Sequence, residues 1–169
     1  GEVLCDLYAN QLSPSMDCLV VRPGNCYGPH DKYDFDKCHV TPATIRKVID
    51  KHNPIQVWGT GEDIRDVIYV DDFVDGLINV MQKCTDKHEV VNIGSNTSYS
   101  VNEILDVCME VDNYDAPIEY ISGKPSMIPI RKISSEKMKD KYGWEAKTSL
   151  SEGIEKTITW YREYYDTES

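Results

Sequence analysis

The sequence predicts an α/β fold in which strands alternate with amphipathic helices. Two short runs, residues 18–22 and 90–93, are apolar and rich in β-branched side chains, as strands buried in a parallel sheet are. Other segments carry apolar residues at intervals of three and four, the period of a helix with one buried face. This alternation favours some parallel pairing, although two central strands are too few for a complete doubly wound sheet.

The expected elements follow in order along the chain. Strands are predicted at residues 18–22, 55–58, 66–70, 90–95 and 118–122. Helices are predicted near residues 3–12, 41–49, 71–81, 100–108, 135–142 and 149–161. The helix near 71–81 should bury an apolar face made of Val74, Leu77, Ile78 and Met81, and the last helix one made of Leu150, Ile154, Ile158 and Tyr161.

Capping signals support several of these helix starts. Thr41 is a good N-cap before Pro42, because proline is favoured in the first helical turn. Ser-x-x-Glu capping boxes occur at residues 100–103 and 149–152. An aspartate at residues 71–72 can cap the helix that follows the strand at 66–70.

Composition excludes several classes of function. The chain has 169 residues, 40% of them hydrophobic, and a net charge of −11, so we expect no nucleic-acid partner. No apolar run is long enough for a membrane span, so a cytoplasmic location without membrane contact is expected. The six cysteines form no C-x-x-C pair and match no zinc pattern, so no metal site is predicted.

The loop after the first apolar strand contains more chemistry than a turn needs. Residues 22–31 hold Arg, Asn, Tyr, His and Asp among Gly and Pro. Parallel strands bind ligands beyond their carboxyl ends, and this loop would lie there. The alternative is an ordinary turn in which Asn25 serves only the backbone.

Four separated segments then resemble one family. They are "VVRPGNCYGP", "VWGTGEDIRDVIYVDDFVDGL", "VVNIGS" and "KYGWEAKTSLSEGIEKTITWY". In this order they resemble the C-terminal half of an extended short-chain dehydrogenase/reductase, the NAD-dependent nucleotide-sugar epimerase/dehydratase family. The resemblance implies the last parallel strands of a Rossmann-type sheet and a smaller substrate-binding α/β domain. It covers nearly the whole chain.

The resemblance implies roles for the polar loop and the helix after it. Pro23 and Cys26 would lie near the nicotinamide, and Asn25 would bind the substrate. The stretch "CHVTPATIRK" is similar to one in the GDP-fucose synthase group, which epimerises and then reduces a GDP-keto sugar. By this likeness His39 would be the acid in epimerisation, a task that suits an imidazole. The alternative for His39 is a surface histidine beside a helix.

Further residues would contact the nucleotide sugar. Val40 would offer backbone contacts to the base, and Lys47 would stand where relatives have a diphosphate-binding arginine. Trp58 would pack at the nucleotide. The remaining basic residues implied to bind it are Arg65, Lys124 and Arg131.

The resemblance also implies what is missing. No Gly-rich cofactor fingerprint occurs, and we expect the catalytic Tyr-x-x-x-Lys pair to be absent, with the chain starting just past that lysine. NAD or NADP would serve the full-length parent, and this chain alone should bind neither tightly. We expect residues 1–25 and 66–95 to be the remnant of the NAD(P)-binding sheet, with the substrate region at 26–65 and 96–169.

The functional prediction is therefore a fragment that supplies a nucleotide-sugar site and is inactive alone. A UDP-hexose 4-epimerase or 4,6-dehydratase fragment is the alternative substrate assignment. A non-catalytic nucleotide-sugar-binding module is the alternative of another class. We also expect a homo-oligomer, formed through the exposed cut surface and the N-terminal helix.

Overall fold

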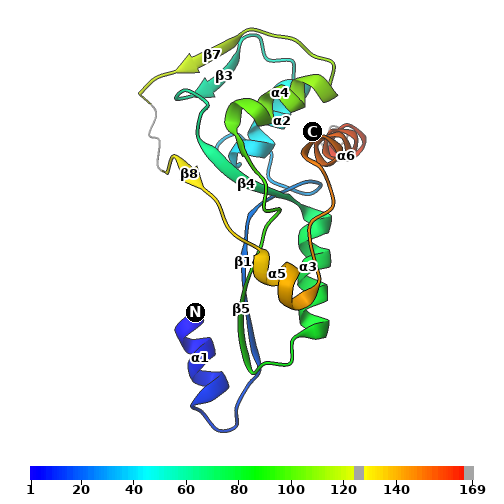
Figure 1. The fold of residues 1–169 in the computed structure, drawn as a ribbon. Coiled ribbons are helices and arrows are strands. Elements are labelled where there is room, and N and C mark those ends of the chain that lie inside the picture. Colours follow the sequence, from blue (N-terminus) through cyan, green and yellow to red (C-terminus); the bar gives the residue numbers. More distant parts are fainter. Residues whose placement is uncertain (124–127, 166–169) are drawn as a thin grey trace.

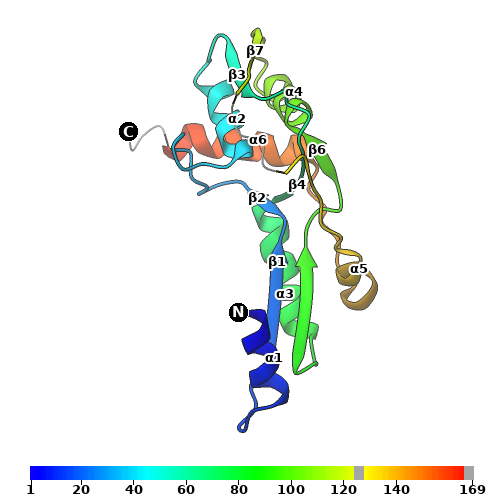
Figure 2. The same cartoon turned by 90° about the vertical axis from the view of Figure 1, so that its left-hand side faces the viewer.

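The protein is an elongated molecule with two lobes, seen here in a computed structural model that describes residues 1–123 and 128–165 (Figures 1 and 2). Its helices are α1 (Glu2–Asn10), α2 (Val40–Ile49), α3 (Val70–Lys83), α4 (Val101–Val111), α5 (Glu136–Tyr142) and α6 (Leu150–Trp160). A short π-helix at Tyr161–Tyr165 continues α6. Its strands are β1 (Cys18–Pro23), β2 (Asn25–Tyr27), β3 (Ile55–Trp58), β4 (Ile64–Tyr69), β5 (His88–Ile93), β6 (Ser98–Ser100), β7 (Ile118–Ile121) and β8 (Ile130–Arg131).

One lobe is built on the parallel pair of β1 and β5, aligned from Cys18 opposite His88 to Pro23 opposite Ile93. Helices α1 and α3 lie on opposite sides of this pair (Figures 1 and 2). The core of the lobe includes Ile68, Val80, Val91, Ile93 and, from the chain around α5, Met138, Tyr142 and Trp144. The predicted parallel pairing of these two strands is confirmed, but among the described residues they form a two-stranded sheet, so neither strand is central in it.

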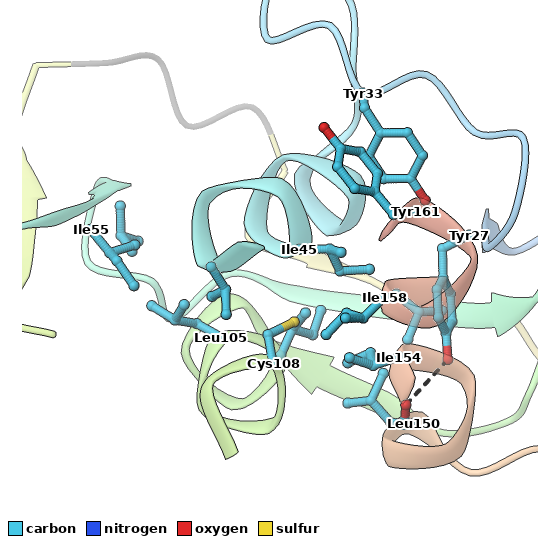
Figure 3. Close-up of a cluster of buried hydrophobic side chains, with 14 of the residues drawn as sticks. Tyr27, Tyr33, Ile45, Ile55, Leu105, Cys108, Leu150, Ile154, Ile158 and Tyr161 are labelled. Carbon is cyan, nitrogen blue, oxygen red and sulfur yellow. Dashed lines mark hydrogen bonds between the residues drawn. The ribbon is translucent and has the colours of Figure 1, made fainter. Parts of the chain in front are cut away.

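The other lobe gathers α2, α4 and α6 around β4. In it β4 pairs with β2 and β8 in parallel and with β6 antiparallel, while β3 pairs with β7. Apolar side chains from all three helices meet in one cluster, in which the buried Tyr27 hydroxyl donates to the Leu150 carbonyl at 3.5 Å (Figure 3). The face predicted for the last helix, Leu150, Ile154, Ile158 and Tyr161, is buried in this cluster as expected.

The predicted face of α3 is wrong in part. Val74, Ile78 and Met81 are exposed, Met81 by 64%, and the fully buried positions are Gly76 and Val80. Trp144 packs against Gly76, where an added Cβ would meet the indole at 2.8 Å. The buried face of α3 is therefore turned by about one residue relative to the predicted face. Periodicity identified the helix but could not choose between its two apolar stripes.

Two predicted caps are also wrong. Helix α2 begins two residues earlier than the predicted cap implies, with His39 as N-cap in place of Thr41, which is buried inside the first turn. Helix α3 has Tyr69 as N-cap, and Asp72 instead accepts hydrogen bonds from the backbone N–H groups of Lys147 and Thr148 at 3.1 and 2.8 Å. By contrast, the capping box of Ser100 and Glu103 is complete. Asp72 thus ties the segment before α6 to α3.

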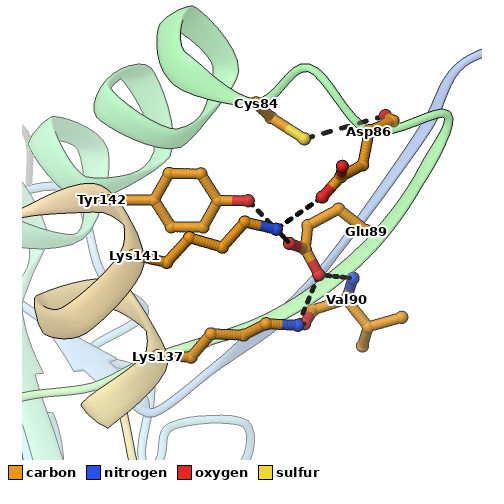
Figure 4. Close-up of polar contacts among 7 residues, drawn as sticks. All are labelled: Cys84, Asp86, Glu89, Val90, Lys137, Lys141 and Tyr142. Atoms are coloured by element: carbon orange, nitrogen blue, oxygen red, sulfur yellow. Dashed lines mark hydrogen bonds and ion pairs between the residues drawn. The ribbon is translucent and has the colours of Figure 1, made fainter.

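A buried carboxylate fastens α5 to the parallel pair. Glu89 of β5 accepts hydrogen bonds from Lys137 Nζ at 2.5 Å, from Tyr142 Oη at 2.7 Å and from Lys141 Nζ (Figure 4). Burial alone would raise the pKa of Glu89, but these donors hold it well below its usual range. The chain after residue 130 therefore returns to the first lobe before it forms α6.

Two further features of the described residues bear on a membrane and on a metal ion. None of the helices in the described ranges is long and apolar enough to cross a membrane. Within residues 1–123 and 128–165, no three His, Cys, Asp or Glu side chains are grouped so as to hold a metal ion.

Candidate functional site

The carboxyl ends of β1 and β5 meet β4 at the junction of the two lobes. The backbone N–H of Gly24 donates to the Ile93 carbonyl at 2.8 Å, so the turns after the two strands lie side by side. Asn25 then starts β2, and its amide nitrogen donates to the Asp66 carbonyl at 2.7 Å. The side-chain donor of Asn25 thus serves the backbone, while its side-chain oxygen stays available for the predicted substrate contact.

The two residues predicted to lie near a nicotinamide flank this turn. Pro23 ends β1 and is exposed. Cys26 is half-buried in β2, and burial raises the pKa of its thiol to about 11. The thiol is therefore protonated at neutral pH, so Cys26 is no ready nucleophile.

His39 and Val40 lie together at the N-terminus of α2. The His39 side chain is exposed and makes no capping hydrogen bond to the helix. Burial raises the pKa of the Asp31 carboxyl, and the charge of nearby His39 acts against that rise. The loop before α2 therefore carries a half-buried carboxyl at Asp31 as well as the exposed His39 imidazole.

Lys47 and Trp58 lie further along the same lobe. The Lys47 ammonium donates to the Gln56 carbonyl at 2.7 Å and thereby ties α2 to β3, and burial lowers the pKa of this lysine. Trp58 ends β3 with 62% of its surface exposed. An exposed indole of this size offers a stacking surface to a planar ring.

Two of the predicted basic residues are brought together. Arg65 of β4 and Arg131 of β8 are register partners on adjacent parallel strands, although 66 positions separate them in the sequence. Like charges placed side by side in this way repel each other unless an anion is near. Arg65 is largely buried and also pairs with Asp63 at 3.0 Å and donates to the Ile128 carbonyl at 2.9 Å. Lys124 lies outside the described residues.

The Tyr-x-x-x-Lys spacing, expected to be absent, does occur in the chain. It is found at Tyr33 and Lys37 and again at Tyr120 and Lys124. In the first case the chain is a loop rather than a helix: buried Tyr33 donates to the Gly28 carbonyl at 3.0 Å, and exposed Lys37 pairs with Asp34. In the second case the tyrosine lies in strand β7. Neither tyrosine lies on a helix that could aim both side chains at one ligand.

Comparison with known proteins identifies the family of this chain. The model of the NAD dependent epimerase/dehydratase family matches residues 1–94, which is more than half of the chain. The chain belongs to this family. That portion includes β1, the polar loop, α2 and β4, which carry most of the candidate residues.

Curated relatives extend the likeness over nearly all of the chain. A GDP-L-fucose synthase from Sinorhizobium fredii is 33% identical over 93% of the chain, and a probable GDP-L-fucose synthase 1 from Oryza sativa is 31% identical over 96%. Half of each relative is covered in these matches, so the chain spans about half the length of the curated relatives that it matches. Family membership therefore leaves the activity of a whole enzyme to be proposed.

A solved structure shows the same fold. The UDP-glucose 4-epimerase of Thermotoga maritima, solved with UDP-glucose, superposes with a TM-score of 0.78 and is 29% identical. The match covers 87% of this chain and 46% of that one. The predicted α/β fold is thus confirmed as part of an extended short-chain dehydrogenase/reductase structure.

Proposed function

We propose that this chain supplies the nucleotide-sugar site of an NAD(P)-dependent epimerase and reductase that acts on a GDP-linked keto sugar. The observation that carries the proposal is the pairing of Arg65 with Arg131 on neighbouring strands. Two arginines from distant segments, aligned in register on neighbouring strands, suit the two phosphates of a nucleoside diphosphate. The likeness to GDP-L-fucose synthases favours a guanine nucleotide.

Each of the other candidate residues has a role in the proposed site. Trp58 packs at the nucleotide, Val40 contacts the base, and Lys47 and Lys124 add positive charge. His39 donates and accepts the proton at the sugar carbon beside the ketone. Asn25 orients the sugar through its side-chain oxygen, since its nitrogen is already used.

The cofactor part of the proposal concerns the first lobe. NAD or NADP would supply the hydride of the reduction, and Pro23 and Cys26 would border its nicotinamide. The parallel pair provides a carboxyl-end edge for such a group, but the chain has no Gly-rich fingerprint to hold the pyrophosphate. We therefore propose that these residues alone bind the nucleotide sugar and bind NAD(P) only weakly.

The domain division stays a prediction that residues 1–25 and 66–95 serve the cofactor side and the remainder the substrate side. The packing suggests one refinement. Helix α5, which the division assigns to the substrate side, contacts β5 and α3 of the first lobe through Glu89 and Met138. It would therefore travel with the cofactor side if the lobes move.

Replacing Arg65 tests the nucleotide-sugar site. Arg65→Ala should weaken binding of a GDP-sugar by about 1.5–3 kcal/mol, because a charge-assisted contact to phosphate is lost. Titration calorimetry measures this directly. Arg162→Ala is the control, since Arg162 is exposed and pairs with Asp112, the C-cap residue of α4. Equal affinities for wild type and Arg65→Ala would contradict the assignment, provided that circular dichroism shows both folded.

A UDP-hexose 4-epimerase is the second candidate. The structural match to an epimerase solved with UDP-glucose favours it. Parallel titrations with a GDP-sugar and a UDP-sugar distinguish the two, because the tighter ligand identifies the base that the Val40 region accepts.

Self-association is the proposed state of the free chain. Within the described residues β1 pairs only with β5, so its other edge offers unpaired backbone groups. Helix α1 adds exposed apolar side chains beside this edge, Val3 by 82% and Leu4 by 57%. We expect light scattering at micromolar concentration to show a dimer or larger assembly. A monodisperse monomer would instead favour a stand-alone sugar-nucleotide-binding module.

A further inference from the structure

A carboxyl group without a counter-charge is buried where the two lobes meet. Asp66 of β4 is 1% exposed, and within the described ranges neither Oδ1 nor Oδ2 accepts a well-formed hydrogen bond, although the backbone N–H of Ser95 lies close enough to favour the charged carboxylate. The next two residues of the strand, Val67 and Ile68, belong to the cores of different lobes. The carboxyl thus occupies the joint between those cores.

The carboxyl rests directly on two glycines. A Cβ added to Gly24 would lie 2.6 Å from Asp66 Oδ1, and one added to Gly94 would lie 2.8 Å from the same oxygen. These glycines form the turns that follow β1 and β5, and the N–H of Gly24 already donates to the Ile93 carbonyl. Asp66 is therefore clamped between the two strand ends, with no space for another side chain.

Among the described residues, none of the groups packed on this carboxyl is charged. On the side of β1 lies Gly24, and the amide of Asn25 is turned to the Asp66 carbonyl instead. On the side of β5 lie Gly94 and Ser95, and the backbone N–H of Ser95 favours the charged form of the carboxyl. The segment before α5 contributes Ile133. On β4 itself, the neighbouring Arg65 is engaged by Asp63.

Burial consequently dominates the titration of Asp66. It raises the pKa of the carboxyl from 3.8 to about 6, and the N–H of Ser95 opposes this rise only in part. A neutral carboxyl tolerates an apolar enclosure, whereas a carboxylate requires donors or water.

We propose that Asp66 is a proton-controlled joint: when protonated it holds the Gly24–Asn25 and Gly94–Ser95 turns together as seen here, and when ionised it loosens them. Asn25 moves with the joint because its amide is bonded to the Asp66 carbonyl. The position of the strand ends, and hence of any ligand bound there, is thereby linked to pH. This inference goes beyond the proposed function and does not rest on it.

The sign of the effect follows from linkage. A raised acid pKa means that the folded state binds the proton more tightly, so this stabilisation is complete below pH 3.8 and is lost as pH rises through about 6. A difference of about two pKa units corresponds to roughly 100-fold in the folding equilibrium constant over the whole range. Between pH 5 and pH 7.5 the Asp66 contribution should fall roughly 10-fold.

The test follows the backbone amides of Gly24, Asn25, Gly94 and Ser95 by NMR between pH 4.5 and 8. We expect a shared inflection near pH 6 in the wild-type chain and none in Asp66→Asn, which is isosteric and cannot ionise. Urea unfolding of both chains at pH 5 and 7.5 gives a second measurement. We expect the Asp66 contribution to the folding equilibrium constant to fall roughly 10-fold between these pH values in the wild type and to be absent in Asp66→Asn.

Asp31→Asn is the matched control. Burial also raises the pKa of Asp31, but this residue lies in the loop before α2, where its carboxyl accepts a hydrogen bond from the backbone N–H of Lys32. The inflection should persist in this variant. An inflection of equal size in Asp66→Asn would overturn the proposal by assigning the titration to histidines. A wild-type stability that differs from that of Asp66→Asn by the same factor at both pH values would overturn it too.

Discussion

The Glu89→Gln substitution should lower the free energy of unfolding by about 2–3 kcal/mol at pH 7, as judged by urea denaturation. Glu89 is buried in β5 and receives hydrogen bonds from Lys137, Lys141 and Tyr142. Breaking a buried ion pair typically costs about 3–5 kcal/mol. We expect less here because both lysines are about half exposed and can turn to water.

The control for this prediction is Glu145→Gln. Glu145 pairs with Lys139 at 2.8 Å, but both side chains are more than half exposed, so its loss should cost under about 1 kcal/mol. Similar losses in the two variants would show that the Glu89 cluster is not what holds α5. The depressed pKa of Glu89 also predicts that this stabilisation disappears as pH falls below about 4.5, and that Glu89→Gln lacks this acid loss.

The His39→Asn substitution should slow proton exchange at the sugar carbon by about 10²–10⁴-fold while sparing binding. This range is typical of the loss of a general acid or base. The measurement requires the chain joined to an NAD(P)-binding half of the family, and follows uptake of deuterium from solvent into the sugar nucleotide. His52→Asn is the control, because His52 is only partly exposed, lies after the end of α2 and borders Asp50. Unchanged exchange in His39→Asn would make His39 a surface histidine only.

Local signals in the sequence predicted the elements well but their surroundings less well. The strand at 18–22 and the helix that buries Ile154 and Ile158 were recognised because each has a strong period and clear ends. The strands β2, β6 and β8 were missed, since each has only two or three residues and little pattern of its own. They exist because β4 offers backbone partners on both sides.

The candidate site shows the same division. The resemblance identified Arg65 and Arg131 separately, but only the register of β4 and β8 places them side by side. The sequence pattern marks Asp66 only as a strand residue. Its burial depends on Gly24 and Gly94, which lie 42 and 28 positions away, and no local pattern reports such a contact. The alignment of the two arginines and the burial of Asp66 therefore depend on tertiary packing, which no local sequence pattern encodes.

One pair of titrations tests the central claim most directly. The purified 169-residue chain is titrated by calorimetry with a GDP-sugar and, separately, with NAD⁺ and NADP⁺, and is then assayed for hydride transfer with both ligands present. The proposed function predicts saturable binding of the nucleotide sugar, far weaker binding of either cofactor and no hydride transfer. Tight cofactor binding with no affinity for the nucleotide sugar, or steady hydride transfer by this chain alone, would contradict it.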